Sequence, residues 1–474
     1  MSGVSNPALT GRDGIVAGAL FFFVFLAHAL SPNATPFDSR WTVYTASSIL
    51  HEGNTDLNEY EAHLEADGFY AIECIQPDKR RTFPVASREQ CPLGRYFNWY
   101  PVAVPALAAP VIGALELGIG VGAPVFREVA DRVSSPPLQR FLRGNLIEAS
   151  PVAEVIVASL IVALTAMFFY LLARELLDRA GAAALAGVLA FCTPAWSTAS
   201  RGLWQHGPAM LMLTLALWIA LRSRDNPTLI RYLGVPLALG FYIRPTGAVP
   251  AVVFSLFVLL HYRRQLVGFL LGVVPVVVVF VTQSYLAYGG PLAPYFYARR
   301  ENADGLGFHS RMGEALAGNL LSPSRGLLVY VPLAALAVWG MLLRPKQDQA
   351  RKLRPYLAAI LALHWLLISS FETWWGGHGY GPRFMTDVMP IIVFFLVPVW
   401  EKARQACRQR RYALPGLVTA LVAASFWVHF QGATRWACYE WSTLPVELNQ
   451  SIERLWDWRD PAFLRGVRGG PPST

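Results

Sequence analysis

The stretch "PVAEVIVASLIVALTAMFFYLLA" (151–173) determines the predicted fold class, because it is a nearly unbroken run of apolar residues. An α-helix rises 1.5 Å per residue, so about 20 apolar residues cross the roughly 30 Å hydrocarbon layer of a bilayer. The blocks "GIVAGALFFFVFLAHAL" (14–30) and "LVGFLLGVVPVVVVFVTQSYLAY" (266–288) have the same character. The sequence therefore predicts a protein that crosses the membrane several times.

The composition agrees with a membrane protein. Of the 474 residues, 54% are hydrophobic and only 15% are charged, whereas about a quarter of the residues in a soluble domain are charged. The net charge of +9 does not predict nucleic-acid binding, because the basic residues lie in short loops between apolar blocks. The first block lacks a basic leader and a small-x-small cleavage site, so we expect it to be a retained first span.

The basic loops predict which linkers share a side of the membrane. Short loops rich in Lys and Arg face the cytoplasm, and four loops of this kind occur, at 222–231, 261–264, 344–354 and 401–411. The loop "ARELLDR" (173–179) joins them as a weaker candidate. The linkers between them must face outward: 200–208, 242–246, 289–325 and the start of "ETWWGGHGYGPR" (372–383).

We therefore expect an all-α integral membrane protein with about 11–13 transmembrane helices, its N-terminus inside and its C-terminus outside. A large outward first loop is expected to carry amphipathic surface helices. Segment 101–150 either crosses the membrane twice or forms a re-entrant or surface hairpin, because its prolines permit both. The predicted units are a first span (1–30), a periplasmic first loop (31–100), a polytopic transmembrane domain (101–430) and a C-terminal periplasmic segment (431–474).

The first loop contains a predicted helix and a predicted disulfide. "RWTVYTASSILHEG" (40–53) repeats apolar residues at helical spacing, which is typical of an amphipathic helix on a membrane surface. An outward loop lies in an oxidising compartment, so we expect Cys74 and Cys91 to pair. Cys438 is a third outward candidate, whereas Cys192 and Cys407 should stay reduced. The chain has no cysteine or histidine spacing typical of a metal site.

Asp38 follows the first span by about eight residues, close to the outer membrane surface. A carboxylate that neighbouring aromatic residues partly desolvate has a raised pKa and can act as a general base. The alternative is structural, because an Asp followed by Ser is also a good N-cap for the predicted surface helix.

Four arginines lie at the outer ends of apolar blocks. Charged residues there are costly and mark functional sites, and the planar guanidinium suits a phosphate such as that of a lipid. The alternative for each is a side chain that extends to the lipid headgroups. The four are Arg201, Arg244, Arg325 and Arg383.

Two further local alternatives concern this outer side. Arg383 and Asp387 are four residues apart, so they pair if both lie on one helical face. His206, in "RGLWQHGP", either forms a hydrogen bond with a hydroxyl or phosphate of a ligand or caps the following helix.

The linker at 372–383 combines aromatic residues with glycines. Aromatic faces pack against sugars, and tryptophans also accumulate at membrane interfaces without a catalytic reason. Glycines cost backbone entropy unless a close approach or a positive φ requires them, so we expect the backbone to lie close to a ligand. The residues concerned are Trp374, Trp375, His378 and Tyr380, with Gly376, Gly377, Gly379 and Gly381.

Together these features resemble the GT-C superfamily of polytopic glycosyltransferases, which use polyprenyl-phosphate sugars. Protein O-mannosyltransferases and lipid A aminoarabinose transferases belong to it. The acidic residue in the first loop of that family matches Asp38, and its aromatic–proline segment resembles Tyr100-Pro101, with Val102 where a second proline is usual. Similar segments are "LWQHGPAM" (203–210), "YIRPTGAVP" (242–250), "SRGLLVYVP" (324–332) and "WWGGHGYGPRFMTDVMP" (374–390).

The resemblance implies transfer of a sugar from a polyprenyl-phosphate donor to an acceptor hydroxyl of a glycan, lipid or protein. The reaction is expected at the periplasmic face of the bacterial inner membrane, with inversion. Asp38 is followed by Ser39 rather than by a second acidic residue, which favours a single base and no divalent metal. We expect no cofactor and no nucleic-acid partner.

Under this interpretation Asp38 is the catalytic base, and arginines stabilise the departing lipid phosphate. Arg244 and Arg383 are the first choices for the phosphate, with Arg325 and Arg201 after them. The predicted remaining substrate contacts are His206, Trp374, Trp375, His378, Tyr380 and Tyr100.

Two other functions fit parts of the sequence. A ligase or polymerase of lipid-linked glycans also uses outward arginines, but its large outward loop is expected late in the chain. A non-catalytic transporter or flippase of lipid-linked sugars predicts pseudo-symmetric halves and helices broken at the midplane, and the sequence has no visible internal repeat.

Overall fold

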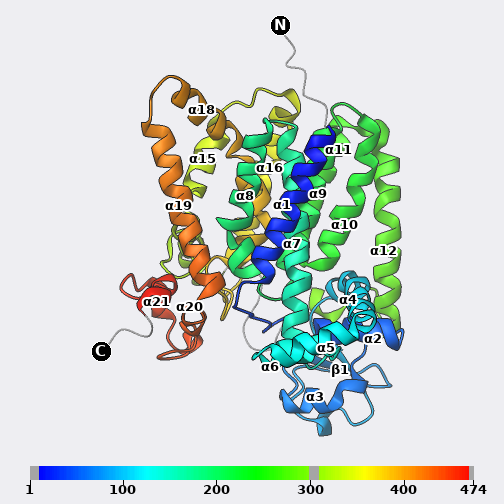
Figure 1. Ribbon diagram of the computed structural model, residues 1–474. Helices are drawn as coiled ribbons and strands as arrows, with labels where there is room; N and C mark the ends of the chain where they lie inside the picture. The colour runs from blue at the N-terminus through cyan, green and yellow to red at the C-terminus, as the bar shows by residue number, and fades with distance from the viewer. Residues whose placement is uncertain (1–9, 298–308, 469–474) are drawn as a thin grey trace.

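The computed structural model describes residues 10–297 and 309–468 of the chain. The remaining residues, which belong to the predicted segments 1–30, 289–325 and 431–474, lie outside this description. Most of the described chain forms a bundle of helices (Figure 1), as predicted, because a helix satisfies its own backbone hydrogen bonds in hydrocarbon. The bundle contains α1 (Gly11–Ala29), α7 (Ser150–Arg174), α8 (Arg179–Phe191), α9 (His206–Arg222), α10 (Gly234–Ile243), α11 (Ala248–His261), α12 (Leu266–Tyr288), α13 (Met312–Leu321), α14 (Leu327–Tyr330), α15 (Ala334–Leu342), α16 (Asp348–Ser369), α17 (Met389–Phe394), α18 (Val397–Arg408) and α19 (Ala413–Thr434).

A smaller layer covers one end of this bundle (Figure 1). It includes a three-stranded antiparallel sheet of order β2-β1-β3, in which Cys74 of the central strand lies opposite Thr82 and Tyr96. The C-terminal helices α20 (Ala437–Glu440) and α21 (Ala462–Arg468) lie at the same end of the bundle. The layer consists of α2 (Thr42–His51), α3 (Glu61–Ala66), β1 (Ile72–Ile75), β2 (Arg81–Thr82), β3 (Arg95–Asn98), α4 (Ala103–Val121), α5 (Ala123–Arg132) and α6 (Pro136–Leu142).

Helices α1 and α7 are antiparallel neighbours, which resolves the topology of segment 101–150. Asp13, in the first turn of α1, forms an ion pair of 2.8 Å with Arg174 at the end of α7. At the other end, Ser39, shortly after α1, donates a hydrogen bond to Glu154 at the start of α7. The whole connection 31–149 therefore returns to the end of the bundle from which it left. Helices α4, α5 and α6 all lie in the layer at that end (Figure 1), so the surface alternative applies rather than two crossings.

Five described helices are long and apolar enough to cross a membrane, and a sixth is added if the bent pair Arg383–Phe394 and Val397–Arg408 counts as one span. One of the five is α4, which lies in the covering layer by the preceding argument. Four further apolar helices have only 10–17 residues: Arg179–Phe191, His206–Arg222, Pro227–Ile243 and Pro245–His261. The predicted 11–13 crossings are thus not matched by helices of full spanning length, and that number stays a prediction.

The outer face of the bundle is apolar. On α12, Val267 and Leu271 expose 71% and 64% of their surface, and neighbouring valines are also exposed. A contiguous exposed apolar face of this kind marks a membrane contact. The core between the helices is formed by buried side chains such as Phe169, Phe254 and Ile360.

The predicted basic loops lie together. Arg404 forms an ion pair with Asp178 at 2.7 Å, Lys346 pairs with Glu401 at 2.7 Å, and Gln347 donates to the Glu175 carbonyl at 2.5 Å. These contacts join loops 173–179, 344–354 and 401–411 at the end of α7 that is remote from the covering layer. The structure therefore agrees with the grouping of these loops on one side.

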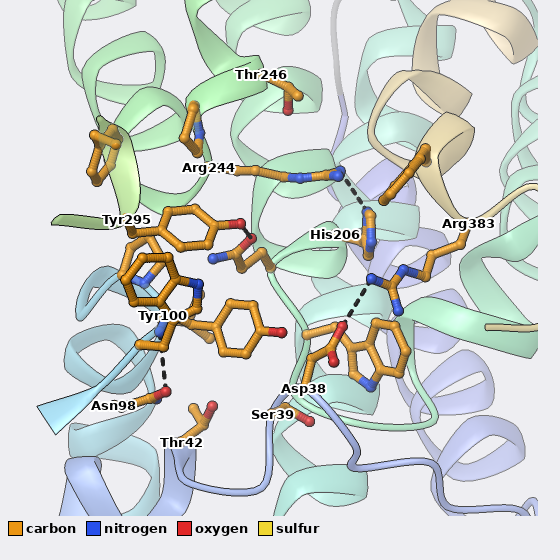
Figure 2. A pocket seen from close by; sticks show the side chains of 18 of the residues that line it. Asp38, Ser39, Thr42, Asn98, Tyr100, His206, Arg244, Thr246, Tyr295 and Arg383 are labelled. Atoms are coloured by element: carbon orange, nitrogen blue, oxygen red, sulfur yellow. Dashed lines mark hydrogen bonds and ion pairs between the residues drawn. The ribbon is translucent and has the colours of Figure 1, made fainter. Parts of the chain in front are cut away.

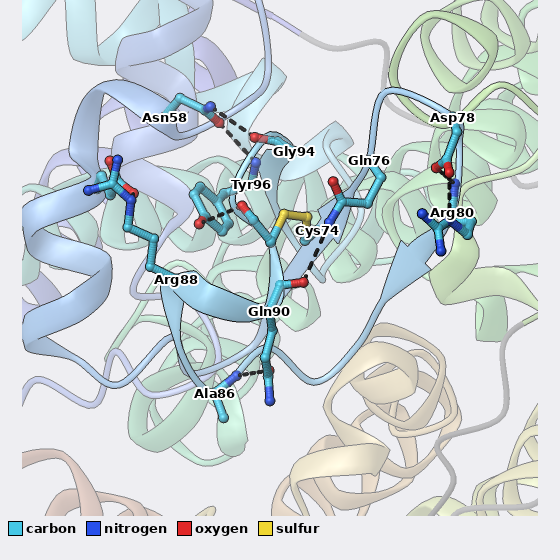
Figure 3. Close-up of a disulfide and its surroundings, with 12 residues drawn as sticks. Asn58, Cys74, Gln76, Asp78, Arg80, Ala86, Arg88, Gln90, Gly94 and Tyr96 are labelled. Atoms are coloured by element: carbon cyan, nitrogen blue, oxygen red, sulfur yellow. Dashed lines mark hydrogen bonds and ion pairs between the residues drawn. A yellow bond between two sulfur atoms is a disulfide. The ribbon is translucent and has the colours of Figure 1, made fainter.

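The predicted disulfide between Cys74 and Cys91 is present (Figure 3). Gly94 allows it, because a Cβ at that position would overlap both sulfur atoms. Asn58 fixes the following turn: its side chain donates to the Gly94 carbonyl at 3.2 Å and accepts from the Tyr96 N–H at 2.9 Å. Cys438, the third outward candidate, is buried and unpaired.

The helix predicted at 40–53 is α2, but it is not an exposed surface helix. Residues Thr42–Ser48 are all buried, and α4 packs against it. Exposed amphipathic character occurs in α5 instead, where Val125 and Val129 are exposed beside charged residues such as Arg127. The sequence pattern did not show that 103–121 would cover α2.

Candidate active site

A cavity of about 380 Å³ opens between the bundle and the covering layer (Figure 2). Its walls come from connections that are far apart in sequence but meet at this end of the bundle. They are the α1–α2 connection, the residues after β3, the start of α9, the α10–α11 connection, residues 295–297 and residues 371–384. The labelled polar lining residues are Asp38, Ser39, Thr42, Asn98, Tyr100, His206, Arg244, Thr246, Tyr295 and Arg383.

Asp38 and Arg383 form an ion pair on the cavity wall, with 2.8 Å between Oδ2 and Nη2. Their side chains are only 19% and 15% exposed. The Tyr70 hydroxyl donates to Asp38 Oδ1 at 2.9 Å. Burial by itself raises the pKa of Asp38, but Arg383 and hydrogen bonds from Tyr70 and Tyr100 outweigh it and lower the pKa below its ordinary value.

Both expectations for Asp38 need correction at this point. The structure does not use it as a helix cap, because α2 begins at Thr42 with Trp41 as its N-cap residue. The expected raised pKa is also wrong, since the neighbouring cation stabilises the charged carboxylate and lowers its pKa.

Arg383 lies flat on an aromatic support. Its guanidinium carbon is 4.3 Å from the ring centre of Trp204 and 5.4 Å from that of Phe384, distances at which a cation is attracted to the ring face. Gly379 makes room for it, because a Cβ there would lie 2.8 Å from Arg383 Cδ. The Nε atom of Arg383 is buried without a hydrogen-bond partner among the described residues.

Asp387 joins a second cluster, with His206 and Arg244. Arg244 Nη1 lies 2.5 Å from Asp387 Oδ2, and the Thr246 hydroxyl donates to the same oxygen at 3.1 Å. His206 Nδ1 lies 2.6 Å from Oδ1. The predicted alternative pair of Arg383 with Asp387 is therefore wrong. Residues 383–388 form a 3₁₀-helix with three residues per turn, so residues four apart do not share a face.

The short contact with Asp387 defines the tautomer of His206. Arg244 and Thr246 are donors, so Asp387 is an acceptor, and a carboxylate at 2.6 Å needs an N–H on the opposing ring nitrogen. The proton therefore lies on Nδ1, and the 2.9 Å approach of Arg244 to the same nitrogen is a contact rather than a hydrogen bond. Nε2 is then an acceptor. The expected alternative of a helix cap is not met, because this side chain bonds to Asp387.

Aromatic rings form another wall of the cavity. The rings of Tyr100 and Tyr295 are 5.7 Å apart, and Tyr295 donates to Gln205 Oε1 at 3.3 Å. Trp99 lies behind them, 5.7 Å from Tyr295. Tyr100 follows β3, so the disulfide-linked layer positions this wall.

Glu154 and Ser39 connect the floor of the cavity to the bundle. Glu154 is fully buried at the start of α7, and its Oε2 accepts hydrogen bonds from the Ser39 hydroxyl and, at 2.9 Å, from the Leu203 N–H. These bonds tie the segment that carries Asp38 to the segment that carries Trp204 and His206.

Residues 142–287 match the model of the dolichyl-phosphate-mannose-protein mannosyltransferase family. The chain carries a GT-C family domain. No curated protein and no solved structure matches the chain. The family match supports a membrane glycosyltransferase of the GT-C type that uses a polyprenyl-phosphate sugar.

The GT-C domain match covers only part of the cavity. Residues Leu203–His206 and Arg244–Thr246 lie within the matched stretch, whereas Asp38 and Arg383 lie before and after it. The candidate site is therefore completed by segments that the match does not reach.

Two arginines predicted for the substrate lie away from the cavity. Arg201 is fully buried and donates to the Ser31 and Asn33 carbonyls at 2.9 and 3.0 Å. Arg325 donates to the Trp375 and Gly377 carbonyls, each at 3.0 Å. Their donors organise backbone: Arg201 holds the segment leading to Asp38, and Arg325 holds the 375–377 turn.

The aromatic residues and histidine of the 372–383 linker also lie outside the cavity lining. Trp374 packs on Gly318, and Trp375 donates to Asn449 at 3.2 Å. His378 lies 3.3 Å from Glu447, and the Tyr380 hydroxyl donates to the Val428 carbonyl at 2.7 Å. The linker faces the C-terminal segment, and of its residues only Thr373 near its start and Arg383 at its end line the cavity.

The glycines of this linker serve its own backbone. Gly376, Gly377 and Gly381 have φ values of 71°, 65° and 62°, a region that side chains disfavour. A Cβ on Gly381 would lie 2.6 Å from the Tyr330 ring. Gly376, Gly379 and Gly381 lie close to protein side chains, and none of the four glycines of the linker lines the cavity.

Sequence reasoning missed several lining or supporting residues: Tyr70, Trp204, Tyr295, Phe384, Asp387 as a partner of His206, and Glu154. Glu154 had a usable signal, since an acidic residue in an apolar span is costly without a partner. Tyr70 and Tyr295 had none, because aromatic residues are common throughout the chain. Among the described residues, no group of three or more His, Cys, Asp or Glu side chains is placed to hold a metal ion.

Proposed function

We propose that this chain transfers a sugar from a polyprenyl-phosphate donor to an acceptor hydroxyl of a glycan, lipid or protein. The reaction takes place at the periplasmic face of the bacterial inner membrane. The single observation that carries this proposal is the Asp38–Arg383 pair on a cavity at the end of the bundle remote from the basic loops. A base and a phosphate-binding cation then lie within one cavity.

In the proposed reaction, Asp38 accepts the proton of the acceptor hydroxyl while its oxygen forms a bond to the anomeric carbon of the sugar. The bond between this carbon and the phosphate oxygen breaks, and polyprenyl phosphate leaves. Arg383 stabilises the charge on the departing phosphate with its guanidinium, which lies on the cavity wall. Arg244 supplies a second cation on the same cavity.

Donor binding also strengthens the base. The pair with Arg383 lowers the pKa of Asp38, which weakens this carboxylate as a proton acceptor. A donor phosphate that takes up the guanidinium neutralises this cation, so the pKa of Asp38 rises when the substrate is in place. The pair thus couples phosphate binding to base strength.

The lining supports a single displacement with inversion. A double displacement needs one carboxylate as nucleophile and a second as acid or base. Among the described lining residues, Asp38 is the only carboxylate. We therefore propose one inverting step that uses no resident cofactor or metal.

The test is Asp38→Asn in the purified protein, assayed with radiolabelled polyprenyl-phosphate sugars and envelope fractions from a deletion strain. Loss of a general base predicts a fall in the transfer rate of about 10²- to 10⁴-fold, with donor binding retained. Asp178→Asn is the matched control, because Asp178 also pairs with an arginine but lies at the opposite end. Transfer at the wild-type rate by the Asp38 variant would contradict the proposal, and donor movement without transfer by the wild type would favour a flippase.

A further inference from the structure

The imidazole of His206 presents one free acceptor to the cavity. Its Nδ1–H is committed to Asp387, and His206 itself is only 3% exposed. Figure 2 shows the ring between Arg244 and the Asp38–Arg383 pair. His206 lines the cavity, whereas Asp387, which faces its Nδ1, is not among the lining residues. The ring edge opposite Nδ1, which carries Nε2, therefore faces the cavity.

The charges around this ring keep it neutral. The groups that face it are Asp387 and Arg244 on one side and Arg383 with its partner Asp38 on the other. Each carboxylate is already neutralised by one arginine, so no negative charge is left to stabilise an imidazolium in this buried position. A neutral ring with its proton on Nδ1 offers only a lone pair at Nε2.

We infer that His206 is a specificity-determining residue that accepts a hydrogen bond from a hydroxyl on the donor sugar, at the carbon next to the phosphate-bearing anomeric carbon. This inference rests on the proposed function. A donor phosphate held by Arg383 or Arg244 places its oxygens at these two cations. His206 lies between the cations, so the sugar carbon next to the anomeric carbon is the one that comes beside its ring. A phosphate oxygen cannot occupy the Nε2 position, because two acceptors repel.

The alternatives for His206 give different results. A phosphate-binding role needs a protonated ring and predicts binding that depends on the phosphate but not on a sugar hydroxyl. A purely structural role, in which His206 only holds Asp387, predicts no preference for a particular hydroxyl group. Discrimination between sugars therefore separates the three roles.

The experiment measures dissociation constants of the detergent-purified protein for three lipids. Each is citronellyl phosphate linked to a different sugar: glucose, mannose or the 2-deoxyhexose that results when the 2-hydroxyl is removed from either of them. We expect the wild type to bind at least one hydroxylated lipid about tenfold more tightly than the 2-deoxy lipid, since a buried acceptor is otherwise left unpaired. His206→Phe keeps a planar ring without an acceptor and is expected to bind all three lipids with equal affinity.

His378→Phe is the matched control, because this histidine lies outside the cavity lining and should retain the discrimination. A melting temperature for each variant in detergent shows that it is folded. Equal binding of the three lipids by the wild type, or discrimination that persists in a folded His206→Phe protein, overturns the inference and leaves the proposed function intact. Failure of the wild type to bind any of the lipids contradicts the proposed function, and the inference falls with it.

Discussion

At the scale of single residues, the site depends on how buried charges are paired. Asp38 with Arg383 and Asp387 with Arg244 each form a close pair at 2.8 and 2.5 Å. A buried charge is tolerated when it is paired and hydrogen-bonded. The sequence placed Asp38, Arg244 and Arg383 on one side of the membrane, but it offered Arg383 and Asp387 as partners because they are close along the chain.

The pairing predicts a pH dependence. With Arg383 in place, the pKa of Asp38 is lowered, so the free enzyme keeps an ionised base down to low pH. In Arg383→Gln the cation is gone while burial remains, and burial raises the pKa of a carboxyl. The acidic limb of the profile of kcat/KM against pH should move to higher pH, together with a loss of rate.

This shift is measured on the residual activity of the variant, because kcat/KM reports the groups of the free enzyme. Arg404→Gln, which breaks the pair with Asp178 at the far end, should leave the profile unchanged. An acidic limb of Arg383→Gln that stays in place or moves to lower pH would show that Arg383 does not control Asp38.

At the scale of elements, the covering layer positions one wall of the cavity. Strand β3 ends at Asn98, and Trp99 and Tyr100 continue directly into the lining. The Cys74–Cys91 bridge joins the central strand to the turn before β3. The position of both cysteines in one outward loop, in an oxidising compartment, was enough to predict this bridge. Only the pairing of β1 with β3 shows that the bridge supports the segment that carries Tyr100.

Replacement of both cysteines, Cys74→Ser with Cys91→Ser, should lower the free energy of unfolding of this layer by about 3 kcal/mol, since the bridge closes a short loop. The transfer rate should fall as well, because Tyr100 loses its fixed position. Thermal unfolding in detergent and the transfer assay measure the two effects. Cys407→Ser, at an exposed unpaired cysteine, is the control, and equal behaviour of the two proteins would contradict the role of the bridge.

At the scale of the whole molecule, charge is segregated between the two ends. The basic loops contact one another at one end, and the cavity lies at the other. The positive-inside rule then predicts that the cavity faces the periplasm. The same asymmetry was visible in the sequence, because loop composition does not depend on which helices pack together.

This orientation is tested with a membrane-impermeant maleimide on spheroplasts. Cys407, in the basic loop 401–411, should be labelled only after permeabilisation. Ser134→Cys in a Cys407→Ser background, between α5 and α6 at the cavity end, should be labelled at once. Labelling in the reverse order would place the cavity in the cytoplasm.

The sequence by itself determined the helical membrane fold, the common side of the basic loops and the cysteine pairing. These features follow from local composition and spacing, which act before any tertiary contact forms. Only the tertiary structure decided which polar residues meet at the cavity. It directed Arg201, Arg325 and the tryptophans of the 372–383 linker into packing, and it brought His206 and Asp387, 181 residues apart, into contact. The physical reason is that a buried hydrogen-bond donor or charge is stable only when it is paired. Which groups pair depends on how helices that are distant in sequence pack together.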